Sequence, residues 1–364
     1  MTAALRPPSL RKIFLYAVLI LLAICLISGA AVYLTLPYGT ARELAQIAGE
    51  MVYQRLFPAA PQPVTFPDGL AAAGAQIAGQ ADPERLMADL NWLAEDARQG
   101  RKAGSPSEDE VGAWITERMQ SLGLRPFEEA GLKQYALVFN SATPGKNAEN
   151  IIGVLPGADE NLPLRERRFL LVGAHYDHLG VGKDGQVYNG ADDDATGTAA
   201  VLEVARLLSS GPRPKETVVF VLFSGEEGGR RGSSALGRLL RARGLTEYSQ
   251  FLNLEVLGAL PGKGTYLDVW DEESHTTTVL VAAVQAAGEA LDIPIQRKKR
   301  DPSSDATRLL AYGVPSVTMD VAWEGGRNHP NTGEDEVSAI DPEGFFMGTR
   351  AAVACTWLLA NDGQ

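Results

Sequence analysis

The chain has 364 residues, of which 45% are hydrophobic and 21% are charged. This composition provides enough apolar side chains for a large buried core and excludes a disordered chain. The formal net charge of -12 argues against nucleic acid as a partner, because proteins that bind phosphates present a basic surface. The two cysteines, Cys25 and Cys355, lie in apolar segments, so we predict neither a disulfide framework nor a catalytic thiol.

The N-terminal segment predicts a membrane anchor. Residues 13–36 contain no charged residue and are long enough to cross a bilayer core of about 30 Å as a helix. Arg6, Arg11 and Lys12 precede this stretch, so the positive-inside rule places residues 1–12 in the cytoplasm and the rest of the chain in the periplasm or outside the cell. A cleaved signal peptide is the alternative, although its apolar part would be longer than usual.

A linker is predicted after the anchor. Residues 37–84 are rich in alanine, proline, glycine and glutamine, a composition that is typical of a stalk. We therefore expect the globular domain to occupy residues 85–364. The sequence does not indicate how many subunits assemble.

Helical and strand patterns alternate along the remainder of the chain. Helices are predicted from Asp82 to Leu93 and over residues 107–122, 198–208, 276–291, 304–311 and 341–359. Strands are predicted over residues 134–139, 150–155, 169–172, 217–223, 251–254, 264–270 and 315–321. This alternation is typical of a three-layer α/β/α domain around a mostly parallel sheet that is buried on both faces.

Several acidic and imidazole side chains follow the most apolar strands. They are His175, Asp177 and His178 after the first of these strands, Glu226 and Glu227 after the second, Glu255 after the third, and Asp192 to Asp194 before the helix at 198–208. Because the carboxyl ends of parallel strands meet at one edge of a sheet, we expect these side chains to lie close together.

Such a cluster predicts a bound cation. The adjacent carboxylates of Glu226 and Glu227 repel each other unless a cation or a proton intervenes. Imidazole nitrogen together with carboxylate oxygen is a ligand set that zinc prefers. The run from Asp192 to Asp194 can also cap a helix, but one of its members can do so while another points into the crevice. Downstream, His329 is a better candidate for a second imidazole ligand than His275, which lies at the start of a predicted helix.

The order of these motifs resembles that of the dinuclear zinc aminopeptidases and their carboxypeptidase relatives, metallopeptidase family 28. The motifs are Gly-Ala-His-Tyr-Asp at 173–177, Gly-Ala-Asp-Asp-Asp-Ala-Thr-Gly at 190–197, Phe-Ser-Gly-Glu-Glu-Gly at 223–228, Asn-Leu-Glu at 253–255, Ser304-Asp305 and the region of His329. The resemblance spans roughly residues 85–360.

This resemblance implies two zinc ions per chain and an exopeptidase, most simply an aminopeptidase that cleaves N-terminal residues from peptides with a zinc-activated water. It implies that His175 and Glu255 each bind one zinc ion, that Asp193 bridges the two ions, and that Glu227 and His329 complete the two shells. Asp177 would orient His175, and Glu226 would be the general base.

Two positions depart from the family pattern. Glu255 stands where an aspartate is usual. A gapless match of the family's histidine-containing motif falls on residues 331–336 and places Asn331, which is a poor zinc ligand, at the position of the histidine. We expect a two-residue shift of the loop to bring His329 there instead.

Three alternatives remain. One is a glutaminyl cyclase, which would use one zinc ion, and another is a membrane-anchored binding protein with a catalytically dead peptidase fold. The third is a carboxypeptidase for acidic peptides, suggested only by the basic run at residues 297–300, which is otherwise expected to be a charged edge strand or loop.

Overall fold

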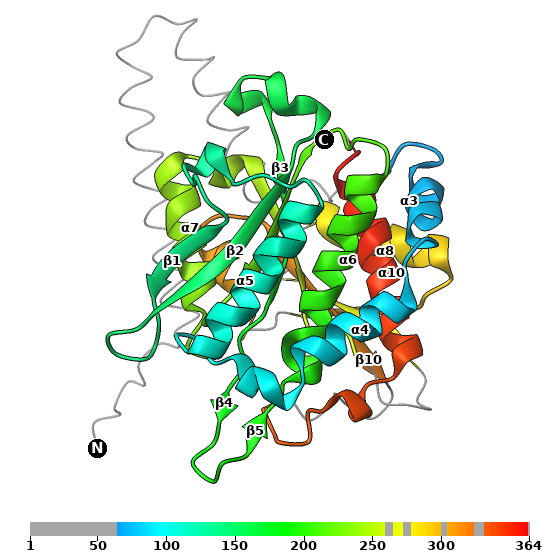
Figure 1. Ribbon diagram of the computed structural model, residues 1–364. Helices are drawn as coiled ribbons and strands as arrows, with labels where there is room; N and C mark the ends of the chain where they lie inside the picture. The colour runs from blue at the N-terminus through cyan, green and yellow to red at the C-terminus, as the bar shows by residue number, and fades with distance from the viewer. Residues whose placement is uncertain (1–63, 259–264, 272–277, 300–303, 324–330, 363–364) are drawn as a thin grey trace, which may run out of the picture. The chain divides into compact units, whose positions relative to one another are not determined.

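The computed structural model describes residues 64–258, 265–271, 278–299, 304–323 and 331–362 (Figure 1). The predicted cytoplasmic tail, the predicted anchor and the first part of the predicted stalk, residues 1–63, lie outside the described residues, as does His329. Among the residues that are described, no helix has the length and apolarity needed to cross a membrane.

Every helix and strand predicted from residue 82 onward is present. The helices are α3 (Leu70–Ala78), α4 (Pro83–Leu93), α5 (Pro106–Ser121), α6 (Gly197–Ser210), α7 (Arg231–Arg243), α8 (Thr278–Leu291), α9 (Asp305–Ala311) and α10 (Pro342–Leu359). The main strands are β1 (Ala136–Asn140), β2 (Asn147–Leu155), β3 (Phe169–His175), β6 (Thr217–Phe223), β7 (Ser249–Leu254), β8 (Thr265–Asp271), β9 (Ile295–Lys299) and β10 (Ser316–Trp323). A small hairpin consists of β4 (Gly180–Val181) and β5 (Val187–Tyr188).

Two helices were not predicted from the sequence. Helix α7 contains glycine, serine and four arginines, so the apolar stripe around its buried Leu236 and Leu240 is narrow. Helix α3 lies within the range that we assigned to the stalk. Its small residues allow close helix packing, and a Cβ atom at Gly74 would lie only 2.9 Å from the carbonyl oxygen of Ala354 in α10. The compact unit therefore begins at Val64, ahead of the predicted boundary at residue 85.

The central sheet has eight strands in the order β1-β2-β6-β3-β7-β10-β8-β9. The four middle strands, β6, β3, β7 and β10, are parallel to one another, whereas β2 and β8 run antiparallel to their inner neighbours. All residues of β3 and β6 are buried, as expected for apolar strands that are covered on both faces.

Helices cover both faces of this sheet (Figure 1). Helices α3, α4, α5, α6, α8 and α10 pack on one face and contribute to the larger hydrophobic core, whereas α7 and α9 pack on the other face. The three-layer arrangement with a mostly parallel centre is thus confirmed.

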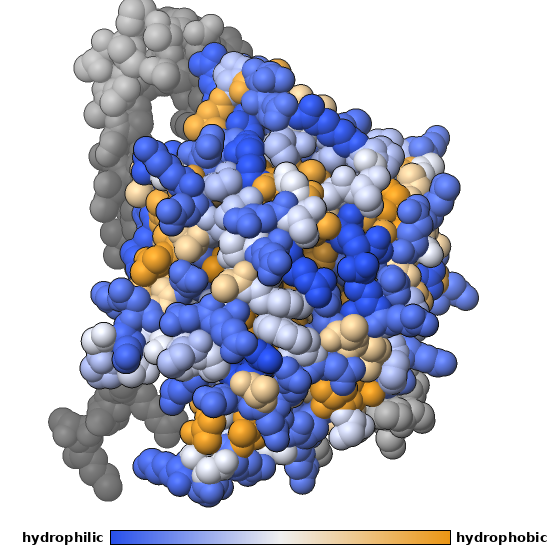
Figure 2. Space-filling view, viewed as in Figure 1, coloured by the Kyte–Doolittle hydropathy of each residue, from blue (hydrophilic) through white to orange (hydrophobic). Residues whose placement is uncertain are grey.

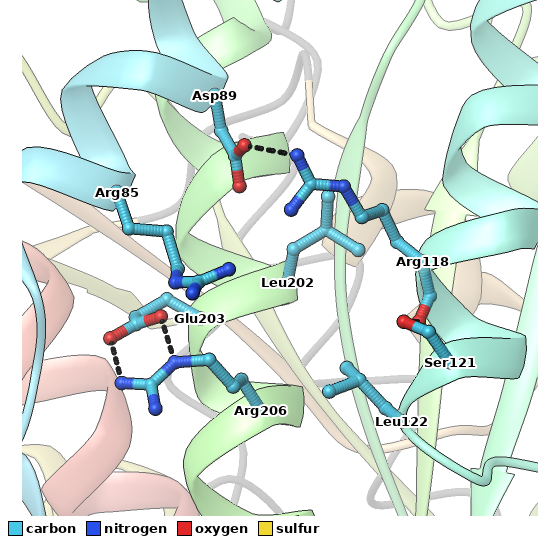
Figure 3. A pocket seen from close by; sticks show the side chains of 8 residues that line it. All are labelled: Arg85, Asp89, Arg118, Ser121, Leu122, Leu202, Glu203 and Arg206. Atoms are coloured by element: carbon cyan, nitrogen blue, oxygen red, sulfur yellow. Dashed lines mark hydrogen bonds and ion pairs between the residues drawn. The ribbon is translucent and has the colours of Figure 1, made fainter.

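One ion pair and one hydrogen bond join three of the helices on the first face, α4, α5 and α6. Arg118 of α5 donates to Asp89 of α4 at 2.7 Å, and the buried Glu203 of α6 accepts from the backbone nitrogen of Asp82 at 2.9 Å and from Arg206 at 2.6 Å. These side chains line a small pocket (Figure 3), while the surrounding surface is mainly hydrophilic with scattered apolar residues (Figure 2). Because Asp89 and Glu203 in this pocket are each paired with an arginine, we interpret the cluster as a set of contacts that stabilises the packing of these helices.

The basic run at 297–300 lies largely in β9, at the edge of the sheet. Arg297 contacts Asp271, and the Lys298 nitrogen lies 3.7 Å from Asp268 in the neighbouring strand. The described part of the run therefore has the features of a charged edge strand, and it does not favour a carboxypeptidase.

Candidate metal centre

Three neighbouring parallel strands deliver acidic and imidazole side chains to one edge of the sheet. His175 is the last residue of β3 and lies opposite Phe223, the last residue of β6. Glu226 and Glu227 follow β6, and Glu255 follows β7 on the other side of β3. The order β6-β3-β7 in the sheet therefore brings these groups to the same edge, as the sequence predicts.

His175 forms the first close imidazole–carboxylate contact. Its Nε2 atom lies 2.9 Å from Oδ1 of Asp193, and its side chain is only 2% exposed. Although this distance is short, Nε2 makes no hydrogen bond of acceptable geometry. Its Nδ1 atom lies 3.0 Å from the backbone oxygen of Asp177 and 3.8 Å from the carboxylate of that residue. The carbonyl of Asp177, more than its carboxylate, thus orients the ring.

His178 forms the second such contact, with Glu227. Its Nδ1 atom lies 3.0 Å from Oε1 of Glu227, again without hydrogen-bond geometry. One ligand atom from each of His178, Asp193 and Glu227 lies within 4.8 Å of the other two. These three side chains have the composition of a zinc-type ligand set.

The three consecutive aspartates, Asp192 to Asp194, make different contacts. Asp194 accepts hydrogen bonds from the backbone nitrogens of His175, Gly197 and Val256 at 3.2, 2.9 and 3.2 Å. Asp192 accepts from the backbone nitrogen of Gly258 at 2.7 Å. The peptide bond between Asp193 and Asp194 is cis, and the carboxylate of Asp193 contacts the His175 ring.

Glu226 lies in a crowded acidic environment. Burial raises its pKa to about 9, and the nearby Asp305, Asp177 and Glu227 add to this effect while His175 opposes it. Burial likewise raises the pKa of Asp177 to about 7. Asp177 accepts a hydrogen bond at 3.0 Å from the backbone nitrogen of Glu226. A bound cation would lower the electrostatic repulsion among these buried acids. The ring nitrogens of His175 and His178 that make no hydrogen bond could be ligands of such an ion.

Comparison with known proteins decides the family. Residues 150–355, more than half of the chain, match peptidase family M28. The chain belongs to this family.

Relatives and solved structures agree with the M28 assignment. The chain is 25% identical over 342 residues to leucine aminopeptidase 1 of Ajellomyces dermatitidis, covering 88% of this chain and 83% of that protein. It is 29% identical over 182 residues to a vacuolar membrane protease of Candida tropicalis, covering 48% and 18%. The chain spans about half the length, or less, of the first curated relatives that it matches.

A zinc aminopeptidase from Bacillus subtilis shares the fold of this M28 chain. Its structure superposes with a TM-score of 0.64 at 17% identity, and the alignment covers 77% of this chain and 96% of that one. At this level of identity the similarity establishes a common architecture.

Two residues that sequence analysis assigned no role hold the acidic loop of the M28 site. Asp335 accepts hydrogen bonds from the backbone nitrogens of Asp192 and Asp193 at 2.7 and 3.1 Å. Arg101 is fully buried and donates to backbone oxygens on both sides of the site: Leu93 at 2.8 Å, Tyr176 at 2.8 Å, Asn189 at 2.6 Å and Gly190 at 2.9 Å. Burial lowers the pKa of Arg101 to about 10.

No local pattern marks Arg101, because it lies in an irregular turn about 75 residues from the nearest site residue in the sequence. Asp335 lies within residues 331–336, the stretch that matches the family's histidine-containing motif, so the sequence could have indicated that it belongs to the site. A buried arginine that donates to distant backbone oxygens can be recognised only once the chain is folded.

The last two predicted ligand positions differ from the others. Oε2 of Glu255 accepts from Asn253 at 2.8 Å, and Glu255 is not part of the close group of His178, Asp193 and Glu227. Asn331 does reach that group: its amide lies 3.4 Å from Asp193 in one orientation and 3.0 Å from both Glu227 oxygens in the other. His329 lies outside the described residues, so its predicted position stays a prediction.

Proposed function

We propose that this chain is a zinc-dependent aminopeptidase that hydrolyses the N-terminal peptide bond of its substrates. The observation that carries the proposal is the convergence of buried imidazoles and carboxylates at the carboxyl ends of β3 and β6 in a chain of family M28. Ligand sites in sheets of this kind lie at that edge. The relatives named as aminopeptidases support the same activity.

We assign the metal ligands by combining the geometry with the family pattern. His175 and Asp193 would hold one zinc ion together with Glu255, and Asp193 and Glu227 would hold the second together with His329. Bound zinc would polarise the scissile carbonyl and acidify the attacking water. Asp193 is the acid that lies close to both imidazole contacts, so it would be the carboxylate that bridges the two ions.

Glu226 is the proposed general base. It is adjacent to a proposed ligand but takes part in neither imidazole contact, and its ion pair with Arg230 spans 3.5 Å. Its carboxylate would accept a proton from water and pass it to the leaving amine. Burial raises the pKa of this side chain and bound zinc would lower it again, so the same group could accept and then release the proton. Asp177 fixes the backbone at Glu226 through its carboxylate and fixes His175 through its carbonyl.

Metal analysis tests this proposal. We expect about two zinc ions per purified chain, and we expect the cleavage of aminoacyl-anilides to stop after chelation and to return on adding zinc. Glu227→Gln should lower the zinc content because it replaces a charged ligand by a neutral amide. One ion per chain would favour the cyclase alternative, whereas a chain without bound metal would favour the dead-fold binding protein.

We also propose that residues 13–36 anchor the chain and that the residues beyond 37 face the periplasm or the exterior. The uncharged segment after Arg6, Arg11 and Lys12 supports this topology, and one relative is itself named a membrane protease. Protease added to intact spheroplasts should then digest the globular part. If the globular part were protected until the cells were lysed, the topology would be reversed.

A further inference from the structure

We propose that His178 is a direct ligand of the second zinc ion, the one bound by Asp193 and Glu227. This inference rests on the proposed function and alters its ligand set, because no motif of the family pattern used above assigns a role to His178. The pattern takes the second imidazole from the C-terminal motif, where a gapless match places Asn331 and the proposed two-residue shift places His329.

The contacts of His178 fit those of a metal ligand. Its side chain is fully buried, and neither ring nitrogen has a hydrogen-bond partner. Its Nδ1 atom nevertheless lies 3.0 Å from Oε1 of Glu227. Leaving a buried polar group without a partner is costly, so such groups are rare. A nitrogen and an oxygen about 3 Å apart that do not point at each other are arranged as two ligands around one zinc, each about 2.0–2.2 Å from the ion.

A simple ion pair between His178 and Glu227 accounts less well for this geometry. A protonated imidazole would direct its N–H at the carboxylate and form a charge-assisted hydrogen bond. The structure has the short distance without that alignment. The carboxylate of Asp193, which approaches the same group, supplies the third ligand that an ion pair does not need.

The backbone holds the His178 ring in this position. Gly190 has a φ of +55°, and a Cβ atom built there would lie 2.4 Å from Cγ of His178. Only glycine therefore leaves room for the ring, and Arg101 donates a hydrogen bond to the carbonyl of Gly190 at 2.9 Å. The ring of His178 therefore occupies the space that a side chain at residue 190 would fill.

Asn331 fits beside the same ion. One atom of its amide group lies 3.0 Å from both Glu227 oxygens. Without an ion, that atom must be the nitrogen, which donates to the carboxylate, because amide orientation follows from the partners. With an ion bound by Glu227, the oxygen can point there instead. His178 then provides the imidazole that Asn331 cannot provide.

The test compares His178→Phe with Tyr176→Phe in the full chain. The first change keeps an aromatic ring but removes the nitrogens, and the second removes a polar atom from the same segment, where the Tyr176 hydroxyl donates to the backbone oxygen of Glu149 at 2.8 Å. We expect His178→Phe to lower the zinc content from about two ions to about one, and to weaken the second zinc site at least 100-fold in a calorimetric titration of the chelator-treated protein. Tyr176→Phe should retain both ions.

The possible results separate this inference from the proposed function. Two tightly bound ions in His178→Phe would overturn the inference and leave the aminopeptidase intact, and equal zinc loss in Tyr176→Phe would also overturn it. A parent protein without zinc would instead overturn the proposed function. Circular dichroism in chelator checks that each variant is folded, and His178→Gln replaces His178→Phe if the latter does not fold.

Discussion

Replacing Glu226 with glutamine is expected to reduce the turnover of an aminoacyl-anilide by about 100- to 10,000-fold, the usual contribution of a general base. The amide has nearly the shape of the carboxylate but cannot accept the proton from water. Because Glu226 takes part in neither imidazole contact, the zinc content should stay at the parent value.

Glu227→Gln is the matched control for this experiment, since it makes the same chemical change one residue further along the same loop. It should lose zinc, because Oε1 of Glu227 faces His178 in the close group. Turnover and bound metal should both be measured for each variant. Near-parental turnover in Glu226→Gln would refute the assignment of the base, and loss of zinc in that variant would mean that Glu226 is a ligand.

Replacing Arg101 with methionine is expected to lower the free energy of unfolding by at least about 3 kcal/mol. Methionine fills the space of the arginine stem, but four backbone oxygens lose a charged donor. Each buried acceptor without a donor costs about 1–3 kcal/mol, and the four are close enough that their costs do not simply add.

Urea unfolding in the presence of chelator measures this loss without a contribution from bound metal. Arg165→Met is a suitable control, because that side chain is 78% exposed and its ion pair with Glu166 spans 3.7 Å. The control should stay within about 0.5 kcal/mol of the parent. Because Arg101 also holds the carbonyls of Tyr176 and Gly190 on both sides of the site, we expect weaker zinc binding in Arg101→Met. A change below 1 kcal/mol would show that water replaces the guanidinium.

The local sequence pattern was sufficient to predict the main strands and most of the helices. The apolar runs of β3 and β6 are long enough to be buried on both faces, and Asp82 and Asp341, each followed by proline, mark the starts of α4 and α10. The same logic misjudged α3, because alanine and glycine are equally compatible with a linker and with closely packed helices. Only the contact of Gly74 with α10 distinguishes the two.

That His175, Glu226 and Glu227 meet at one edge of the sheet follows from the sequence alone, because each comes at the carboxyl end of a predicted parallel strand. Which groups face each other was decided by tertiary structure. Asp193 turns toward His175 because Asp335, 142 residues away, holds its backbone nitrogen. His178 points at Glu227 because Gly190 leaves space for its ring. Such contacts join segments that are distant in the chain, and side-chain direction depends on them more than on local spacing.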